Sequence, residues 1–261
     1  MSETQPLNVH REVKTILISQ PQPSGKSPYL DLSEKYNLKI DFYQFIQVEG
    51  VTAKEFRREK ANPADFTAII FNSRTAIEHF FRLCGEMRAT ISPDMKYFCS
   101  SEAIALYLQK FIDYRKRKVF YNKNNKSDLY SLLEKHKAKE KFLYPCADIR
   151  SNDVPDFLQE NNFNYSEAVI YHIVSSDLSD LKDIYYDIIV FFTPLEIKSL
   201  YDNFPDFEQK NTRIACWGQS AAQALLDHGL RIDIHAPSPE LPSMTMALED
   251  YVQKVNIKEE V

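Results

Sequence analysis

The sequence predicts an α/β protein built from two similar domains, each a parallel sheet flanked by helices, joined by a two-stranded linker. Apolar strand-like runs alternate with helical patterns along the chain, which is typical of parallel sheets covered on both faces. About nine such units are too many for one compact sheet. One unit also recurs: "TAIIFNSRTAIEHFF" (67–81) resembles "DIIVFFTPLEIKSLY" (187–201) and aligns Ser73 with Thr193, an offset of 193 − 73 = 120.

The repeat continues into the next unit. "KYFCSSEAIALYL" is followed at nearly the same offset by "IACWGQSAAQALL", which pairs Ala103 with Ala222 and Leu106 with Leu225. Two consecutive units that recur in the same order favour two similar halves. The alternative is that buried strand–helix units resemble one another by chance.

Two strand patterns, 38–50 and 164–176, are longer than the usual five or six residues. Each is expected to leave one domain and enter the other. The first domain is then discontinuous, formed by residues 1–42 and 173–261, and the second is formed by residues 43–172. The linker strands are expected near 40–48 and 167–174.

The individual elements follow from local signals. Ser27 is a cap-like residue and Pro28 suits a first helical position, so a helix is expected over 27–36. The remaining helices are expected at 74–86, 101–112, 126–138, 153–161, 194–203, 219–228 and 242–254. The remaining strands are expected at 14–20, 66–71, 95–100, 117–121, 141–146, 186–192, 212–218 and 230–236.

Composition and motifs exclude several functions. The net charge of −5 argues against a nucleic-acid partner. No apolar run approaches the ~20 residues of a membrane span, and the first residues lack a signal peptide's apolar core, so a cytoplasmic protein is expected, with no membrane partner. No Gly-rich phosphate loop, GxSxG or HExxH motif occurs, and the histidines lack ligand-like spacing, so no metal site is expected. The four scattered cysteines are expected to be reduced and packed as apolar side chains.

Hydroxyl residues follow several predicted strands. In open α/β sheets, ligands bind beyond the carboxyl ends of the strands, where the next helix offers free N–H groups. These positions are Ser73, Ser100 or Ser101, Thr193 and Ser220. Each is also explained by capping of its own helix, but four such ends in two halves suggest a cleft that binds several carboxylates or phosphates.

Tyr171 lies in the second linker strand, "EAVIYHIV", where its side chain is expected to face the gap between the domains. Its hydroxyl is suited to donate a proton to a leaving group. The alternative is an ordinary strand aromatic. The basic run "RKRK" (115–118) is interpreted as a solvated face or as a region that attracts an anionic ligand.

The chain resembles the uroporphyrinogen-III synthase family over nearly its whole length. The resemblance rests on short motifs in a fixed order: "SPYLDLSEKYNLKIDFYQFIQVE", "AIIFNSRTAIEHF", "FLYPCADIR", "AVIYHIVSS", "IIVFFTPLEIKSL", "WGQSAAQALLDHGL" and "APSPELPSMTMAL". It implies two α/β domains on a two-stranded linker, with the active site in the cleft. It also implies cyclisation of hydroxymethylbilane, an octacarboxylate, with inversion of the last pyrrole ring, through a spirocyclic intermediate, and loss of water, without cofactor or metal. A monomer is expected.

The resemblance also implies roles for particular residues. Tyr171 matches the family's candidate catalytic tyrosine, which assists departure of the substrate hydroxyl as water. The residues expected to bind substrate are Ser73, Ser101, Arg150, Thr193, Gly218 and Ser220.

The sequence departs from the family at Ala221, which replaces a threonine, and at Cys99 and Glu102, which replace a glycine and a threonine. Two alternatives therefore remain open. One is a catalytically reduced relative that binds a tetrapyrrole or another polycarboxylate without turnover. The other is an unrelated two-domain binder of small molecules.

Overall fold

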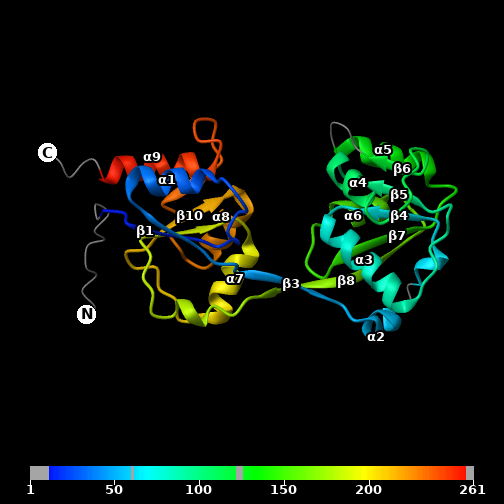
Figure 1. Ribbon diagram of the computed structural model, residues 1–261, viewed down its shortest axis with the longest axis horizontal. Helices are drawn as coiled ribbons and strands as arrows, with labels where there is room; N and C mark the ends of the chain where they lie inside the picture. Colours follow the sequence, from blue (N-terminus) through cyan, green and yellow to red (C-terminus); the bar gives the residue numbers. More distant parts are fainter. Residues whose placement is uncertain (1–11, 60–61, 122–125, 257–261) are drawn as a thin grey trace. The chain divides into compact units, whose positions relative to one another are not determined.

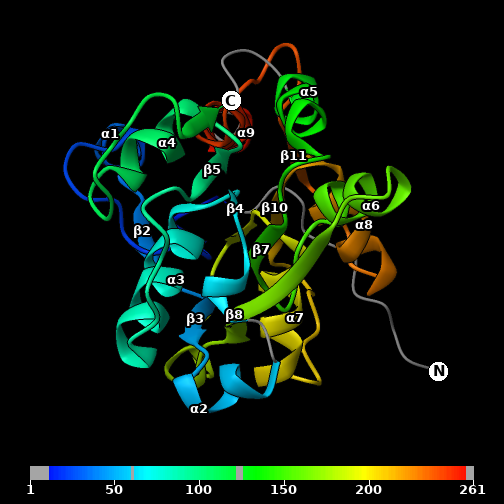
Figure 2. The ribbon, with the colours of Figure 1, turned by 90° about the vertical axis from the view of Figure 1, so that its right-hand side faces the viewer.

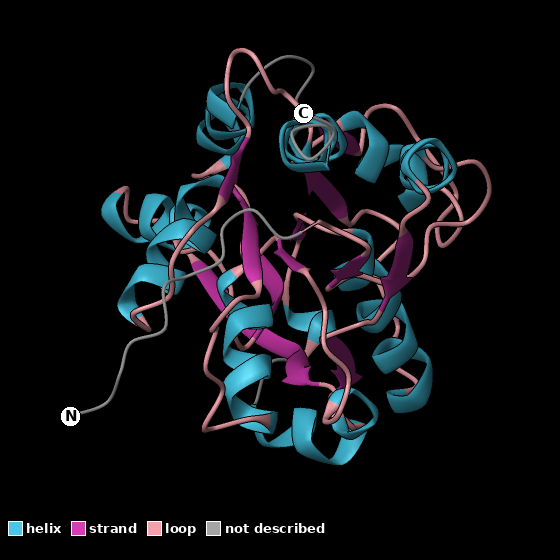
Figure 3. Cartoon of the chain, turned by 90° about the vertical axis from the view of Figure 1, so that its left-hand side faces the viewer, coloured by secondary structure: helices cyan, strands magenta, loops and turns pink. Residues whose placement is uncertain are grey.

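The computed structural model describes residues 12–59, 62–121 and 126–256. The chain divides into two compact units, of which unit 1 consists of Met1–Gln47 and Val174–Val261 and unit 2 of Val48–Ile173. In both, helices and strands alternate along the chain (Figure 3). No helix in the described part of the chain is long and apolar enough to cross a membrane.

Unit 1 contains a five-stranded parallel sheet of order β11-β10-β9-β1-β2 (Figure 1). Its strands are β1 (Thr15–Ile18), β2 (Lys39–Phe42), β9 (Ile188–Phe191), β10 (Arg213–Trp217) and β11 (Ile234–Ala236). Its helices are α1 (Pro28–Tyr36), α7 (Pro194–Asn203), α8 (Gly218–Asp227), α9 (Met244–Asn256) and the 3-10 helix η3 (Ser179–Leu181). Helices α1 and α9 bury Leu32 and Leu248 in one core, and α7 and α8 bury Leu200 and Leu225 in another. The sheet therefore has an apolar core on each face.

Unit 2 contains a six-stranded sheet of order β3-β8-β7-β4-β5-β6. Its strands are β3 (Ile46–Gly50), β4 (Ala68–Phe71), β5 (Lys96–Cys99), β6 (Val119–Tyr121), β7 (Phe142–Ala147) and β8 (Tyr165–Ser175). Its helices are α2 (Ala53–Phe56), α3 (Arg74–Met87), α4 (Glu102–Leu108), α5 (Lys126–His136), α6 (Asp153–Glu160), and the 3-10 helices η1 (Arg57–Glu59) and η2 (Pro63–Asp65).

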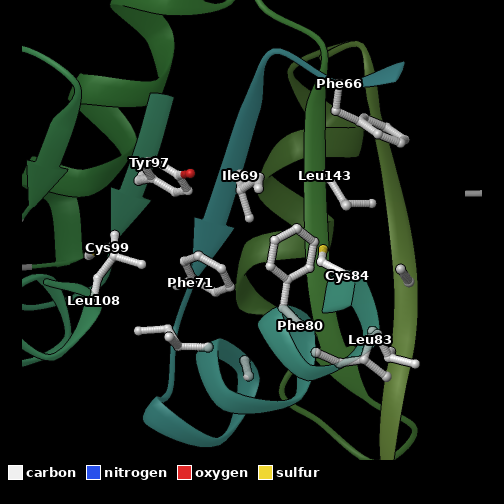
Figure 4. Close-up of a cluster of buried hydrophobic side chains, with 14 of the residues drawn as sticks. Phe66, Ile69, Phe71, Phe80, Leu83, Cys84, Tyr97, Cys99, Leu108 and Leu143 are labelled. Atoms are coloured by element: carbon white, nitrogen blue, oxygen red, sulfur yellow. The ribbon is translucent and has the colours of Figure 1, made fainter. Parts of the chain in front are cut away.

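The two faces of this second sheet are also covered. Phe80 and Leu83 of α3 pack with Ile69 of β4 and Leu143 of β7 in one core (Figure 4). Leu158 of α6 packs in the core on the other face, together with α5. Strands buried on both sides explain why the apolar runs are continuous rather than alternating.

The two sheets repeat one strand order, which confirms that the halves are similar. The order is β6-β5-β4-β7-β8 in unit 2 and β11-β10-β9-β1-β2 in unit 1. The recurring segments occupy the same places in these two orders, because β4 corresponds to β9 and β5 to β10. Ser73 and Thr193 are both N-cap residues, with φ, ψ of −147°, 158° and −141°, 155°. The 120-residue offset therefore relates equivalent positions.

The alignment of the second recurring unit is wrong. Ala222 and Leu225 are buried, whereas Ala103 and Leu106 are exposed. The strand pairings instead place Cys99 beside Phe71 and Cys216 beside Phe191. Their offset is 216 − 99 = 117, so the loop lengths of the two halves differ.

One of the two long strands is confirmed and the other is not. β8 runs unbroken for 11 residues (Figure 2). Segment 38–50 divides into β2, in the first sheet, and β3, beside β8. The break occurs where the Tyr43 amide bonds the carbonyl of Ile18 at 2.9 Å and the Phe45 amide bonds the carbonyl of Ser19 at 3.4 Å.

β3 and β8 run in opposite directions, because the Ser176 amide donates to the Phe45 carbonyl and the Val51 amide to the Ile170 carbonyl. The boundaries between the units fall within these two strands, after Gln47 and after Ile173. The boundaries expected after residues 42 and 172 lie a few residues away. All four cysteines are buried and none forms a disulfide, as predicted.

Candidate functional site

A β-bulge sets the position of Tyr171. In the β7–β8 pairing, Cys146 is opposite Val169, but the next residue of β7, Ala147, is opposite Tyr171. Ile170 is therefore an extra residue, and such a bulge re-aims the side chains that follow it. Tyr171 lies level with the last residue of β7 and is only 7% exposed. It occupies the carboxyl edge of the parallel part of the sheet, where ligands bind in such folds.

Ser73 contacts the hydroxyl of Tyr171. Ser73 is the N-cap of α3 and its Oγ accepts a hydrogen bond of 3.0 Å from the Ala76 amide. The same Oγ lies 3.4 Å from the Tyr171 hydroxyl oxygen. The structure thus brings together two residues that are 98 positions apart in sequence. The capping role expected of Ser73 is therefore confirmed, and the same hydroxyl also contacts Tyr171.

The surroundings of Tyr171 keep its phenol protonated. Burial raises its pKa, while the hydrogen bond with Ser73 acts in the opposite direction. A phenol whose pKa is above the ordinary value of about 10 is fully protonated at neutral pH. Tyr171 therefore presents a protonated hydroxyl at the edge of the sheet.

Ser101 lies at the end of the neighbouring strand, β5. It is the N-cap of α4 and its Oγ accepts from the Ile104 amide at 3.3 Å. Ser100, beside it, donates from Oγ to the Asn72 carbonyl at 3.3 Å. Ser101 caps its helix, and no contact links it to Tyr171 among the described residues.

Sequence reasoning missed a polar pair at this edge. Asn72 donates from Nδ2 to the hydroxyl of the buried Tyr144 at 2.6 Å. Asn72, Ser100, Tyr144 and Ser151 line a cavity of about 200 Å³ beyond the ends of β4, β5 and β7. The available signal was Asn72 itself, which directly follows a buried strand and precedes the helix cap.

Arg150, which follows β7, pairs with Glu167 of β8. This ion pair offsets the charge of Arg150. Its Nε atom is buried and lacks a hydrogen-bond partner among the described residues. Glu102, one of the departures, is exposed in the first turn of α4 and accepts a hydrogen bond from the Tyr121 hydroxyl at 3.2 Å.

In unit 1, the end of β9 is occupied by a carboxylate of the chain itself. The amides of Phe192 and Thr193 donate to Glu196 Oε2 at 2.5 and 3.1 Å. The hydroxyl of Ser19 donates to the same oxygen at 2.7 Å. Burial raises the pKa of Glu196, while these three hydrogen bonds oppose the shift. Thr193 Oγ1 is buried and makes no hydrogen bond with another described residue.

The end of β10 differs, because its helix begins without a side-chain cap. Trp217 occupies the N-cap of α8 and makes no side-chain capping bond. Gly218 follows with φ of 76°, a conformation that glycine adopts without strain. Ser220 is exposed in the first turn, so the expectation that it caps its helix is wrong. Helix starts of this kind bind anions through free N–H groups.

The chain was compared with known proteins. A family model described as uroporphyrinogen-III synthase HemD matches residues 32–246. No curated protein matches the chain. A uroporphyrinogen-III synthetase structure from Helicobacter pylori is 18% identical, with a TM-score of 0.60, covering 93% of this chain and 100% of the other. A mutant uroporphyrinogen III synthase from Thermus thermophilus is 12% identical, with a TM-score of 0.56 and the same two coverages. At these identities the structures establish the fold.

Proposed function

Because the chain belongs to the uroporphyrinogen-III synthase family, we propose that it catalyses the family's reaction. The linear tetrapyrrole hydroxymethylbilane is closed to uroporphyrinogen III, with inversion of ring D. The hydroxyl group of the substrate leaves as water, so the product is the substrate less one water. The observation that supports this proposal is the buried phenol of Tyr171 at the carboxyl edge of its sheet, 3.4 Å from Ser73 Oγ.

Tyr171 is the proton donor in this proposal. Departure of hydroxide is difficult, and protonation of the leaving oxygen converts it to water. A phenol with a raised pKa is present in the donor form at neutral pH. Ser73 offers a hydroxyl within reach of the phenol oxygen, which holds the phenol in place when it donates. Positioning of the substrate contributes the larger share of the rate.

The substrate carboxylates are proposed to bind at helix starts and hydroxyl groups of both units. In unit 1 the donors are the first turn of α8 at Gly218 and Ser220, which has no side-chain cap, and Thr193 joins them when its buried Oγ1 becomes exposed. In unit 2 they are Ser73 and Ser101, with Arg150 joining when a carboxylate replaces Glu167 as its partner. Hydroxyl and N–H donors bind carboxylates without the cost of burying many cations.

The second candidate is a protein of this family that binds a tetrapyrrole without turnover. Glu196 favours it, because its carboxylate occupies the amides of Phe192 and Thr193. Glu102 favours it as well, since it adds an exposed negative charge beside Ser101. An unrelated small-molecule binder is excluded, because the family model matches most of the chain.

In the test, hydroxymethylbilane is generated in the reaction mixture with and without the protein. The products are then oxidised, and the porphyrin isomers are separated by chromatography. Without a synthase the substrate closes to isomer I, so conversion to isomer III demonstrates the proposed activity. Tyr171→Phe is expected to lower kcat by roughly 10- to 100-fold, at or below the lower end of typical general acid contributions. Tyr165→Phe, near the start of the same strand, is the matched control and is expected to retain activity.

Isomer I alone, from folded protein that binds the tetrapyrrole, would establish the second candidate instead. Full activity of Tyr171→Phe would refute the role of the phenol while leaving the reaction in place.

A further inference from the structure

The ring of Tyr171 is contacted by a histidine that the proposed chemistry does not use. The His79 and Tyr171 rings are stacked, with centroids 5.3 Å apart and planes inclined by 28°. His79 belongs to α3, the helix that Ser73 caps. One helix therefore contacts Tyr171 twice, at the hydroxyl through Ser73 and at the ring face through His79.

Arg82 holds His79 in this orientation. Its Nη2 lies 3.4 Å from His79 Nδ1 and donates to the Val51 carbonyl at 2.7 Å. Its Nη1 forms an ion pair with Glu86 at 2.7 Å. A guanidinium only donates hydrogen bonds, so Nδ1 is an acceptor and the imidazole proton resides on Nε2. Arg82 thus connects the imidazole to the backbone just after β3.

Gly50 provides the space for this arrangement. A Cβ at position 50 would lie 2.6 Å from Arg82 Nη2 and 2.7 Å from His79 Nδ1. Such distances are far inside van der Waals contact. The backbone of Gly50 is not in the left-handed region, so a side chain here would displace His79 and Arg82 rather than strain the backbone. Gly50 is one of only five glycines in the chain. It is the residue of β3 against which the side chains of His79 and Arg82 lie.

The imidazole is neutral at physiological pH. Burial lowers the pKa of His79, and the neighbouring Arg82 lowers it further, while Glu78 acts in the opposite direction. Among the described residues, the titratable groups that act on it are Arg82 and Glu78 of its own helix, Tyr171 of β8 stacks on its ring, and Gly50 of β3 lies against it. Protonation would remove the acceptor for Arg82 and place two cations side by side.

We propose that His79 is a positioning residue for Tyr171, held by Arg82 in the space that Gly50 leaves open. The inference rests on the proposed role of Tyr171 in turnover. His79 does not touch the reacting atoms. It fixes the plane of the phenol ring, so that the hydroxyl meets the leaving group at one angle, and a small misplacement of such a group reduces the rate.

Two substitutions distinguish the effect of the stacked His79 ring from the effect of its hydrogen bond with Arg82. His79→Leu removes the flat ring and is expected to lower kcat about tenfold, with KM nearly unchanged. His79→Phe restores a flat ring and is expected to recover most of kcat. His228→Leu is the matched control: His228 also stacks on a tyrosine, Tyr201, at 4.6 Å, but in unit 1. It is expected to leave both constants unchanged.

A spectroscopic measurement tests the position of the ring without reference to activity. 3-Fluorotyrosine introduced at position 171 alone gives one fluorine resonance. This resonance is expected to shift and broaden in His79→Leu and in Gly50→Ala, and to stay near its original position in His79→Phe. Gly85→Ala is the control for Gly50→Ala, because a Cβ at Gly85 meets nothing within 4 Å. Below pH 6.5 the resonance is expected to titrate in the parent protein but not in His79→Phe.

The outcomes distinguish this inference from the proposed function. An unchanged fluorine resonance in His79→Leu, or an unchanged kcat, overturns the positioning role even if isomer III is formed. If the parent protein forms only isomer I, the proposed function fails, and with it the catalytic meaning of the inference. The fluorine spectra then decide only whether His79 fixes the ring.

Discussion

At the scale of single residues, the protonation of Tyr171 determines how the proposed activity depends on pH. Burial raises its pKa above the ordinary value of about 10. The donor form is therefore complete at pH 7 and is lost only as pH rises through the raised value. We expect kcat to keep its phenol-dependent component up to about pH 9 and to lose it above about pH 10.

The measurement is kcat for isomer III formation between pH 7 and 10.5, with circular dichroism to confirm that the fold persists. Tyr171→Phe is the control, and its residual rate is expected to lack the alkaline decrease. A decrease centred near pH 8 in the parent protein would contradict a protonated phenol with a raised pKa.

Gly218 offers a second prediction at this scale. Its φ is 76°, and a Cβ there would meet no atom within 4 Å. Gly218→Ala is therefore expected to lower the free energy of unfolding by about 1–2 kcal/mol through backbone strain alone. Gly85→Ala, within α3, is expected to raise it by about 0.5–1 kcal/mol, because alanine favours helix. Urea unfolding of both variants measures the difference, and equal effects would refute the backbone explanation.

Only part of the site is predictable from individual residues. Ser73 and Thr193 follow apolar runs, so local pattern is enough to place them at strand ends. The stack of His79 on Tyr171 depends on a bulge at Ile170 and a glycine in another strand. The stacked pair, the bulge and the glycine come from three separate stretches of sequence. They meet only through tertiary packing, so no local pattern predicts their arrangement. For the same reason the carboxylate of Glu196 was not expected beside Ser19.

At the scale of elements, Glu196 links the start of α7 to the end of β1. Glu196→Ala leaves the Ser19 hydroxyl and two amides without their acceptor, and is expected to lower the free energy of unfolding by about 2 kcal/mol. Glu196→Gln retains an acceptor oxygen and is expected to cost much less at pH 7. Chemical denaturation of both variants measures this, and an equal loss in both would assign the effect to charge instead.

The raised pKa of Glu196 fixes the sign of its pH effect. Its folded pKa lies above the unfolded value, so its stabilising contribution is complete below about pH 4.3 and is lost as pH rises through the folded pKa. The stability of the parent protein relative to Glu196→Gln is therefore expected to decrease from pH 4 to pH 7. A relative increase over that range would contradict burial as the dominant cause.

Element boundaries were predictable where the signals were local. The helix after Ser27 begins with Pro28, and Ser27 accepts a hydrogen bond from the Tyr29 amide, as the cap pattern indicates. The strand pattern over 38–50 was misread, because β-propensity continues through Tyr43 while the chain changes sheets there. A change of hydrogen-bond partner leaves no mark in the hydrophobic pattern.

At the scale of the molecule, each unit has its own hydrophobic cores. We therefore expect a destabilising core substitution to affect mainly the unit that contains it. Phe80→Ala, in the core of unit 2, is expected to destabilise the protein by about 3–5 kcal/mol. Hydrogen exchange measured by mass spectrometry is expected to accelerate mainly in residues 48–173. Leu248→Ala is the counterpart in unit 1 and is expected to accelerate exchange in residues 12–47 and 174–256. Uniform acceleration in either variant would show that the units unfold together.

The strand order of unit 1 also determines when its sheet can be completed during synthesis on the ribosome. β1 pairs with β9 through Ile16 and Ile188, which are 188 − 16 = 172 residues apart. At a translation rate of about 5–20 residues per second, β9 is synthesised roughly 10–30 s after β1. All of unit 2 emerges within that interval. β1 can pair with β2 soon after both are made, but its other edge stays without β9 until unit 2 has been synthesised.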